Sequence, residues 1–249
     1  MPKALITGAS SGIGRCIAKE LSRMGYETVL VARRTDKLQL LQKELVSPSY
    51  VVTADLSDIK QVKNLADNYQ DIDILINNAG FGVYGEFIET DFERESEMID
   101  VNIRALHFLM KAYIPVFERR GGGKILNVAS SAAFFPGPFL SSYYATKAYV
   151  LRLSRAVREE LRKKKSPVSI SVLCPGPVKT EFGKVSGSNL GAGALSAQYV
   201  SKVAIKGMLC KKAVIVPGFT MKCMRFLSKI LPDAIAVKIL YKIQKAKKI

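Results

Sequence analysis

The sequence predicts an α/β fold, with a doubly wound and mostly parallel sheet of about seven strands in a single domain. Two observations carry this prediction. Short apolar runs, typical of buried strands, recur from Ala4 to Val216, and amphipathic helical patterns alternate with them. A glycine-rich loop separates the first run from the first helical pattern. Right-handed crossovers would then place helices on both faces of the sheet.

The domain is expected to cover residues 1–218, followed by a helical tail at 219–249. No linker rich in Pro, Gly or Ser divides residues 1–218, and no internal repeat is visible. With 249 residues, of which 48% are hydrophobic, the chain can bury one large core. The expected strands are Lys3–Thr7, Glu27–Ala32, Tyr50–Ala54, Asp73–Ile76, Lys124–Ala129 and Ser169–Leu173.

The composition is strongly basic. Its net charge of +17 will attract anions, which include phosphorylated cofactors, acyl-carrier proteins, nucleic acids and acidic lipid surfaces. Charge alone does not choose among these partners. The densest basic run, Arg162–Lys165, stands at the expected end of a helix, where cations complement the helix dipole. A solvated helix end therefore explains this run without a ligand.

Several classes of protein are disfavoured. The chain begins with a strand pattern rather than a secretion signal, and no apolar run reaches the roughly 18 residues that a membrane span needs. A cytoplasmic protein, soluble or peripheral to a membrane, is expected. The cysteines form no CxxC pair, and His107 is their only companion for metal binding. We expect no metal site and no disulfide, but four reduced and mostly buried thiols at Cys16, Cys174, Cys210 and Cys223.

The glycine-rich loop predicts an anion site. It precedes a helical pattern whose apolar stripe runs through Ile17 and Leu21 and ends near Gly25. Glycines let backbone amides and the helix N-terminus approach a pyrophosphate that side chains would exclude. The residues expected to contact the phosphates are Gly8, Ser10, Ser11, Gly12, Ile13 and Gly14.

The spacing of these glycines, Thr-Gly-x-x-x-Gly-x-Gly, resembles that of short-chain dehydrogenases/reductases rather than the usual GxGxxG pattern. The resemblance continues through Asn77-Asn78-Ala79-Gly80, the pair Tyr143 and Lys147, and Pro175-Gly176, in the family's order and at its intervals. It covers about residues 1–218. The resemblance implies a Rossmann-like fold, a nicotinamide cofactor, and a reaction at a CH–OH or C=O group.

The second strand indicates which nicotinamide cofactor is used. NAD would need an acidic residue after Glu27–Ala32 for its ribose hydroxyls, and none is there. Arg33 and Arg34 occupy this turn, with Lys37 one helical turn later, and guanidinium groups pair well with a 2′-phosphate. NADP(H) is therefore favoured, with Arg33 as the first choice, although two arginines could also simply begin an exposed helix.

Three further segments would contact the cofactor, as the resemblance implies. One follows the third strand and would meet the adenine, one follows the fourth strand and would line the adenosine ribose, and one would close over the nicotinamide. Their residues are Asp55, Leu56, Asn78, Ala79, Gly80, Pro175, Gly176, Val178 and Thr180. An alternative for Asp55 is the N-cap of the next helix.

The resemblance places the reaction at Ser130, Tyr143 and Lys147. Tyr143 and Lys147 are four residues apart on one helix face, so their side chains share a site. Positive charge from Lys147 and an oxidised nicotinamide would lower the pKa of the Tyr143 phenol from its usual value of about 10. Tyr143 would then donate a proton to a carbonyl oxygen during reduction and accept one during oxidation. Ser130 would hydrogen-bond that oxygen, and Lys147 would also hold the ribose hydroxyls.

Two neighbours compete for these roles. Ser131 is the alternative hydroxyl donor to Ser130, and Tyr144 lies three residues before Lys147, so it could reach the same surface. The spacing of four residues favours Tyr143.

Two polar residues lie on a predicted helix that precedes these motifs. Asn102 matches the family asparagine that holds a water against the active-site lysine and completes a proton relay, whereas an asparagine within a helix is otherwise usually solvated. His107 lies in an apolar stretch and is expected to pack there with one hydrogen bond.

A substrate lid is expected at about residues 181–198, because glycines and small residues such as Gly191-Ala-Gly193-Ala make this stretch flexible. Six residues near motif ends are candidates for an apolar substrate pocket, and core packing explains each of them equally well. They are Phe81, Val83, Phe134, Phe135, Phe139 and Phe182.

The tail is expected to form two basic amphipathic helices that Pro232 separates. One apolar stripe includes Met221 and Met224, and the other includes Ile235 and Ile239. Such helices could cover the pocket, pair subunits, or make peripheral contact with an anionic membrane.

Two functions compete at this point. The first is an NADPH-dependent oxidoreductase, a homodimer or homotetramer, acting on a 3-oxoacyl thioester, a steroid-like compound or a small ketone. The second is a non-catalytic protein on the same scaffold that senses dinucleotides or binds anions or nucleic acid, which the charge of +17 favours. The intact Ser, Tyr and Lys set favours the enzyme, and nucleic acid is not the expected partner.

Overall fold

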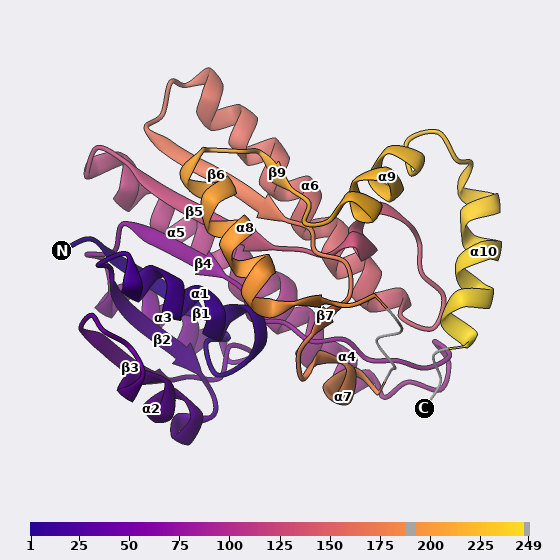
Figure 1. Cartoon of the computed structure of the whole chain (residues 1–249), viewed down its shortest axis with the longest axis horizontal. Helices are drawn as coiled ribbons and strands as arrows, with labels where there is room; N and C mark the ends of the chain where they lie inside the picture. The colour runs from indigo at the N-terminus through magenta and orange to yellow at the C-terminus, as the bar shows by residue number, and fades with distance from the viewer. Residues whose placement is uncertain (188–192, 247–249) are drawn as a thin grey trace.

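The central element of the fold is a sheet of seven parallel strands. The structure, a computed structural model, describes residues 1–187 and 193–246. The strands are β1 (Lys3–Thr7), β2 (Glu27–Ala32), β3 (Ser49–Thr53), β4 (Ile74–Asn77), β5 (Gly123–Val128), β6 (Val168–Leu173) and β9 (Val214–Ile215). They run in the order β3-β2-β1-β4-β5-β6-β9, so the winding direction reverses between β1 and β4. The predicted doubly wound α/β fold is confirmed (Figure 1).

Each of the predicted strands is present, with ends that differ by at most one residue. Their apolar runs are continuous because helices cover both faces of a parallel sheet. All six residues of β6, Val168–Leu173, are buried, for example. The last strand, β9, has two residues and pairs with Val172 and Leu173 of β6. It is too short to give a periodic signal of its own.

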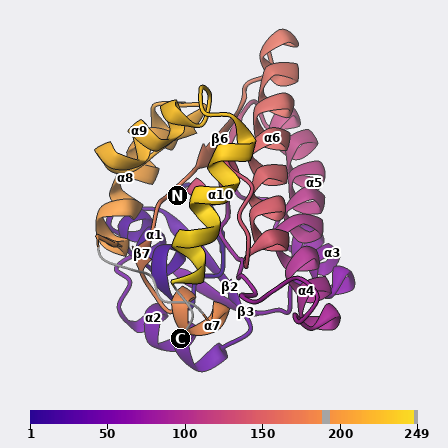
Figure 2. The same cartoon turned by 90° about the vertical axis from the view of Figure 1, so that its right-hand side faces the viewer.

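Helices form a layer on each side of the sheet (Figures 1 and 2). One layer contains α1 (Gly12–Arg23), α2 (Thr35–Lys43) and α8 (Ala197–Leu209). The other contains α3 (Ile59–Asn68), α5 (Leu106–Arg119) and α6 (Ser141–Lys163). Alternate strand residues serve the two cores, since Ile6 belongs to the first and Leu5 to the second.

Short elements connect this framework to the carboxyl edge of the sheet. Before α5, the chain forms α4 (Phe92–Ile99) and the π-helical turn η1 (Asp100–Ala105). A 3₁₀ turn, η2 (Ser131–Phe134), follows β5. Both turns bring side chains to the ends of β4 and β5. The cavity described below lies at these ends.

The described part of the predicted lid at 181–198 contains regular structure. It contains the short helix α7 (Phe182–Ser186) and the strand β8 (Leu195–Ser196), and its last two residues begin α8. β8 pairs with β7 (Val178–Lys179), and the Leu195 amide donates to the Pro177 carbonyl at 2.9 Å. These backbone hydrogen bonds hold the stretch at Leu195 and Ser196. Residues 188–192, which include part of the Gly191-Ala-Gly193-Ala run, lie outside the described residues.

The tail forms two helices, α9 (Phe219–Leu227) and α10 (Asp233–Lys245), with Pro232 at the N-cap of α10. This confirms the predicted pair of helices separated by Pro232. Figure 1 shows them at the right-hand edge, beyond the carboxyl ends of β5 and β6. α9 approaches the chain after β6 so closely that a Cβ added at Gly176 would stand 2.5 Å from the Met221 sulfur.

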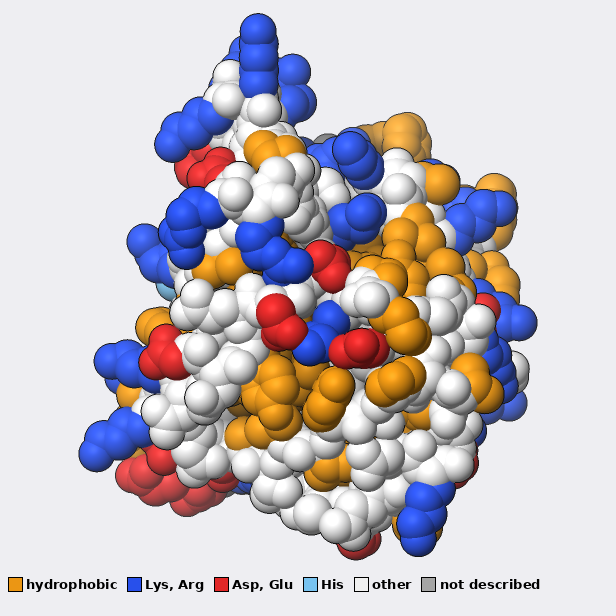
Figure 3. Space-filling model, turned by 90° about the vertical axis from the view of Figure 1, so that its left-hand side faces the viewer, with side chains coloured by type: hydrophobic (Ala, Val, Ile, Leu, Met, Phe, Trp, Pro, Cys, Tyr) orange, Lys and Arg blue, Asp and Glu red, His pale blue; other side chains and the backbone are white. Residues whose placement is uncertain are grey.

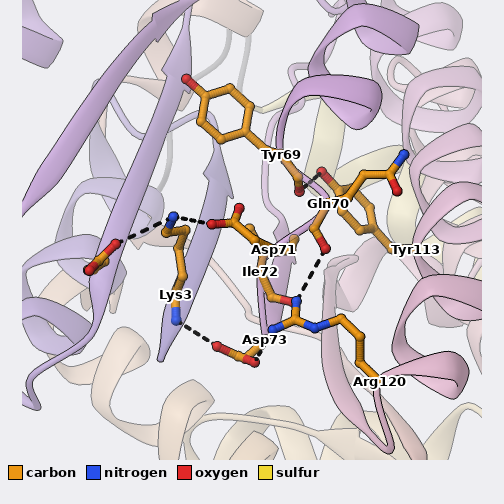
Figure 4. A network of polar contacts seen from close by, with 9 residues as sticks. Lys3, Tyr69, Gln70, Asp71, Ile72, Asp73, Tyr113 and Arg120 are labelled. Atoms are coloured by element: carbon orange, nitrogen blue, oxygen red, sulfur yellow. Dashed lines mark hydrogen bonds and ion pairs between the residues drawn. The ribbon is translucent and has the colours of Figure 1, made fainter. Parts of the chain in front are cut away.

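A polar network closes the opposite, amino-terminal edge of the sheet (Figure 4). The Lys3 amide donates to the Asp73 carboxylate at 2.8 Å, and the Lys3 ammonium pairs with Asp71. Arg120, just after α5, donates to the Ile72 carbonyl at 2.6 Å and to Asp73 at 3.1 Å. Charged side chains at this edge therefore hold β1, β4 and α5 together.

The cysteines are less buried than predicted. Only Cys174 is buried, Cys16 is partly buried, and Cys210 and Cys223 are exposed. The prediction is wrong for the last two, because Cys210 caps the end of α8 and Cys223 lies on a helix with no buried residue. All four are free thiols. Within residues 1–187 and 193–246, no cluster of His, Cys, Asp and Glu could hold a metal ion, and no helix is long and apolar enough to cross a membrane.

Candidate active site

A cavity of about 520 Å³ lies at the carboxyl ends of the strands. Loops after β1, β2, β3, β4, β5 and β6 line it, which is the expected ligand position in a doubly wound sheet. The site residues predicted from sequence that line it are Gly8, Ser10, Ser11, Gly12, Ile13, Arg33, Arg34, Asp55, Leu56, Asn78, Ala79, Gly80, Ser130, Tyr143, Lys147, Pro175, Gly176, Val178 and Thr180. The structure thus brings most of the predicted residues together. Gly14, Lys37 and Asn102 do not line the cavity.

Gly14 shapes the glycine loop from behind. A Cβ at this position would stand 2.4 Å from the Asn78 amide nitrogen and 2.5 Å from the Gly8 carbonyl oxygen. Asn78 is itself held there, because its side-chain amide donates to the carbonyls of Thr7 (2.9 Å) and Gly8 (3.2 Å). The segment after β4 therefore supports the loop after β1, and a glycine at Gly14 is what lets the two meet.

Two arginines stand at one end of the cavity. Arg34 donates to the Ser10 hydroxyl at 3.0 Å and to the Glu181 carboxylate at 2.7 Å. Arg33 pairs with Glu97 at 2.6 Å. Lys37 lies outside the cavity because its ammonium is held by Glu181, also at 2.7 Å.

Glu181 is the carboxylate that faces this cluster. The hydrogen bonds from Lys37 and then Arg34 lower the pKa of Glu181 to about 2, so it stays ionised at neutral pH. Asp55 accepts hydrogen bonds from Ser57, while Asp58 is the N-cap of α3. The alternative role of Asp55 as that cap is therefore excluded.

Ser130, Tyr143 and Lys147 meet at the other end of the cavity. Ser130 lies after β5 as the N-cap of η2, Tyr143 and Lys147 lie one turn apart in α6, and the Ser130 side chain hydrogen-bonds the Tyr143 phenol. The Lys147 ammonium donates to the Val128 carbonyl at 3.0 Å and lies 5.8 Å from the centre of the Tyr143 ring. Tyr143 and Lys147 are both buried, with 8% and 4% of their surface exposed.

Burial dominates the pKa values of this pair. It raises the pKa of Tyr143 above its usual range, and the hydrogen bond with Ser130 offsets this only in part. Burial also lowers the pKa of Lys147 to about 8. The lowering expected with an oxidised nicotinamide bound stays a prediction, because loss of solvation sets the Tyr143 pKa in the protein alone.

The lowered pKa of Lys147 predicts how the stability of the protein depends on pH. Between pH 8 and about 10, the unfolded chain binds a proton at Lys147 that the folded protein has lost, so stability rises with pH. The expected gain is about 3 kcal/mol. Urea unfolding of the wild type and of Lys147→Met across this range measures it. The variant should lack this rise and be more stable than the wild type at neutral pH. If the free energy of unfolding rose equally with pH in the two proteins, the lowered pKa of Lys147 would be wrong.

Asn102 lies behind the cavity in the π-helical turn. It is 1% exposed, and its side-chain amide makes two hydrogen bonds with the backbone of Phe81. The Asn102 nitrogen donates to the Phe81 carbonyl at 2.9 Å, and the Asn102 oxygen accepts from the Phe81 N–H at 3.1 Å. The same nitrogen donates to Thr146 in α6. A Cβ at Gly80 would contact both the Asn102 oxygen (2.7 Å) and the Lys147 nitrogen (3.1 Å). Asn102 thus adjoins Lys147, and single π-turns are frequent at functional sites.

The competing residues have other partners. The Ser131 amide donates to the Pro175 carbonyl at 2.7 Å, and its side chain also lines the cavity. The Tyr144 hydroxyl bonds the Gln244 side chain of α10 rather than Lys147. His107 bonds the Tyr149 hydroxyl at 2.6 Å, which agrees with the predicted packing role and one hydrogen bond.

The apolar pocket contains fewer of the predicted residues than expected. Phe81 and Phe182 line the cavity, but Val83, Phe134, Phe135 and Phe139 do not. Phe139 has a positive φ of 64°, which turns its ring out to stack near Tyr84 (5.9 Å) and Tyr241 (5.1 Å). Its role is to hold α10 against the domain.

Several cavity residues were not predicted as site residues. Five of them are Arg94, Leu140, Tyr144, Val185 and Gln244. The position of Gln244 could have been predicted from the sequence, because Ala236, Leu240 and Gln244 repeat at intervals of four and so share one helix face, on which Gln244 is the polar member. The other four come from elements that only the fold brings to the cavity.

Taken together, the sheet, the glycine loop and the Ser, Tyr and Lys side chains define a dinucleotide-binding oxidoreductase scaffold. The chain matches the short chain dehydrogenase family over residues 2–190, and it belongs to that family. An uncharacterized oxidoreductase of Staphylococcus epidermidis is 35% identical over 181 residues, which cover 71% of this chain and 78% of the relative.

Three further proteins show what such relatives bind or do. The NADP-dependent 3-hydroxy acid dehydrogenase of Escherichia coli is 32% identical over 187 residues, 73% of this chain and 75% of the relative. The solved short-chain dehydrogenase from Sphingobium yanoikuyae, in complex with NADPH, has a TM-score of 0.82 at 29% identity and covers 94% of this chain and 98% of that one. A bulky-bulky ketone specific alcohol dehydrogenase from Comamonas testosteroni has a TM-score of 0.80 at 29% identity, covering 92% of each chain.

Proposed function

We propose that the protein is an NADP(H)-dependent oxidoreductase that interconverts a carbonyl and a secondary alcohol on a large, apolar substrate. One observation carries the proposal: the cavity joins the Arg33 and Arg34 guanidinium groups at one end to the Ser130, Tyr143 and Lys147 side chains at the other. The NADP-dependent relative and the NADPH-bound structure support this cofactor, and the ketone-specific alcohol dehydrogenase supports this substrate class.

The residues present fit NADP(H). Glycine amides and the hydroxyls of Ser10 and Ser11 suit the pyrophosphate, and the guanidinium groups suit a 2′-phosphate, with Arg33 as the first choice. Asp55 and Leu56 would then meet the adenine, and Asn78, Ala79 and Gly80 the ribose. Pro175, Gly176, Val178 and Thr180 would meet the nicotinamide. Lys37 would act only indirectly, through Glu181.

The chain's own residues then handle the substrate oxygen. When bound, the cofactor would supply the hydride that adds to a carbonyl carbon in reduction, and its oxidised form would accept the hydride that leaves a carbinol carbon in oxidation. Ser130 donates a hydrogen bond to the oxygen, and Tyr143 gives it a proton in reduction or takes one in oxidation. Lys147 stabilises the phenolate that remains and holds the ribose hydroxyls, and Asn102 steadies Lys147 through a water.

Further properties belong to the same proposal. We expect a cytoplasmic homodimer or homotetramer whose ligands are small molecules rather than nucleic acid. The substrate lid is the stretch at about 181–198, and Phe81 and Phe182 provide its apolar wall.

The test is titration of the purified protein with NADPH and NADH, followed by absorbance-monitored turnover of bulky ketones and acyl thioesters. NADPH should bind more tightly, and at least one bulky ketone should be reduced. If neither dinucleotide binds at low salt, the proposal fails.

Two single variants sharpen the test of the cofactor. Arg33→Ala and Arg34→Ala should each weaken NADPH binding about 10- to 100-fold, because each removes a charge-assisted contact to the 2′-phosphate, and should leave NADH binding nearly unchanged. Arg104→Ala is the matched control, since Arg104 pairs with Asp100 at 3.4 Å and does not line the cavity. Equal losses for NADPH and NADH would show that these arginines do not read the 2′-phosphate.

A further inference from the structure

The outer side of the C-terminal tail carries a surface that the catalytic proposal does not use. We call it the tail surface, and it consists of exposed apolar residues and basic residues of α9, α10 and the turn between them. The apolar members are Phe219, Phe226, Leu227, Ile230, Ile235, Ile239, Tyr241 and Ile243. The basic members, all of them exposed, are Lys222, Lys229, Lys238, Lys242 and Lys245. In Figure 2, which looks onto this side, both helices lie in front of the other elements.

The apolar residues form stripes rather than isolated contacts. On α9 and its following turn, Phe219, Phe226 and Ile230 fall on one helical face, and they are 81%, 66% and 64% exposed. Cys223, also exposed, lies on the same face. On α10, Ile235, Ile239 and Ile243 repeat at intervals of four and are each about half exposed. No residue of α9 is fully buried, and Met221 is the residue of this helix that packs, partly buried, against the core.

Basic residues flank both stripes. Lys222 and Lys229 lie to one side of the α9 stripe, and Lys238, Lys242 and Lys245 to one side of the α10 stripe. Residues 219–249 hold eight Lys and Arg and a single Asp, a net charge of +7 out of +17 for the whole chain. The opposite face of the molecule, by contrast, mixes Asp and Glu with Lys and Arg (Figure 3).

The tail surface is held in place by its inner side. Gln244 is 2% exposed and bonds Tyr144, and its backbone carbonyl accepts from the Tyr84 hydroxyl at 2.7 Å. Tyr241 packs on Phe139. The loop that carries Tyr84 also exposes Phe87 and Ile88. Because the inner side lines the cavity and the outer side faces away from the domain, the exposed stripes need no rearrangement to meet a partner.

We propose that the tail surface docks on an anionic membrane. Helices with an exposed apolar stripe and lysines along its flank bury the stripe at the acyl boundary and place the lysines among lipid phosphates. Charge selects this occupant over a second copy of the chain, since two tail surfaces would set the five exposed lysines of one against the five of the other. Docking would hold the cavity beside the lipid, where large apolar substrates dissolve.

The test is flotation of the full-length protein with phosphatidylglycerol vesicles and with phosphatidylcholine vesicles. We expect binding to the first and not to the second, weakened by salt. The double variant Lys222→Glu/Lys229→Glu should reduce binding at least about 25-fold. Lys163→Glu/Lys164→Glu makes the same change in net charge at the exposed end of α6 and should reduce binding far less. Phe226→Ser/Ile230→Ser should also reduce it, whereas Leu40→Ser, at an exposed site on α2, should not.

The two exposed cysteines give an independent readout of orientation. An environment-sensitive dye on Cys223, in a Cys16→Ser/Cys210→Ser background, should report an apolar environment when anionic vesicles are added. The same dye on Cys210, in a Cys16→Ser/Cys223→Ser background, should not respond. Lack of binding to anionic vesicles at low salt, equal losses for the α6 and tail charge variants, or equal responses of the two dyes would each overturn the proposal. The proposal would also be overturned if sedimentation showed a dimer that the tail variants convert to monomers, because the tail surface would then bind a second copy of the chain.

Discussion

Replacing Tyr143 by Phe is expected to lower the rate of carbonyl reduction about 10³-fold while leaving the fold and NADPH binding intact. The variant removes only the phenolic oxygen, which is the group hydrogen-bonded with Ser130 at the cavity wall. Burial raises the pKa of this phenol in the protein alone, so it enters the reaction protonated and ready to act as an acid. Without it, the substrate oxygen has no proton donor except Ser130 or water.

Single-turnover kinetics with preformed NADPH complex measure this effect directly, because product release does not mask the chemical step. Tyr144→Phe is the matched control, since its hydroxyl bonds Gln244 and lies one residue away in the same helix. The control should lose less than about tenfold. A near wild-type rate for Tyr143→Phe would remove Tyr143 from the mechanism.

Gly14→Ala is expected to destabilise the protein by about 3 kcal/mol and to abolish dinucleotide binding. Helix propensity alone predicts the opposite sign, because alanine is favoured over glycine in a helix by about 1 kcal/mol. The added Cβ, however, would stand 2.5 Å from the Gly8 carbonyl and 2.4 Å from the Asn78 amide. Neither atom can yield easily, since Asn78 is tied to the carbonyls of Thr7 and Gly8.

Urea unfolding and NADPH titration measure the two parts of this prediction. Gly25→Ala, at the other end of α1, is the control: it has a φ of +82° but nothing within 4 Å of the added Cβ. It should cost only about 1 kcal/mol of backbone strain and leave NADPH binding unchanged. If Gly14→Ala were as stable as Gly25→Ala, the close approach of the glycine loop to Asn78 would be wrong.

Local patterns were enough to predict the sheet and the positions of most site residues. A strand buried on both faces shows as a continuous apolar run, so β1, β2 and β6 were found almost to the residue. The carboxyl ends of parallel strands meet at one edge, so motifs that follow strands converge without further information. That is why the glycine loop, Arg33 and Ser130 all line one cavity.

Prediction failed where contact partners come from distant segments. Phe139 was one of the candidates for the pocket, with core packing as the equal alternative, but it has a left-handed backbone and its ring packs with those of Tyr84 and Tyr241 instead. Cys210 and Cys223 were expected to be buried because thiols usually are, and nothing in their neighbourhood in sequence shows which side of the helix faces solvent.

The sequence by itself determined the fold class, the glycine loop, and the spacing that places Tyr143 and Lys147 on one face, since these depend on residues close together in the chain. Only the tertiary structure decided the direction of the pKa shifts of that pair and the position of the tail. Burial, which sets both pKa values, is produced by β5, α6 and the segment after β6 together. Likewise, α10 reaches the cavity through Gln244. Its hydrogen-bond partners there are Tyr84 and Tyr144, which lie 160 and 100 residues earlier in the chain. Solvation and long-range contact depend on the whole packed chain, whereas periodicity does not.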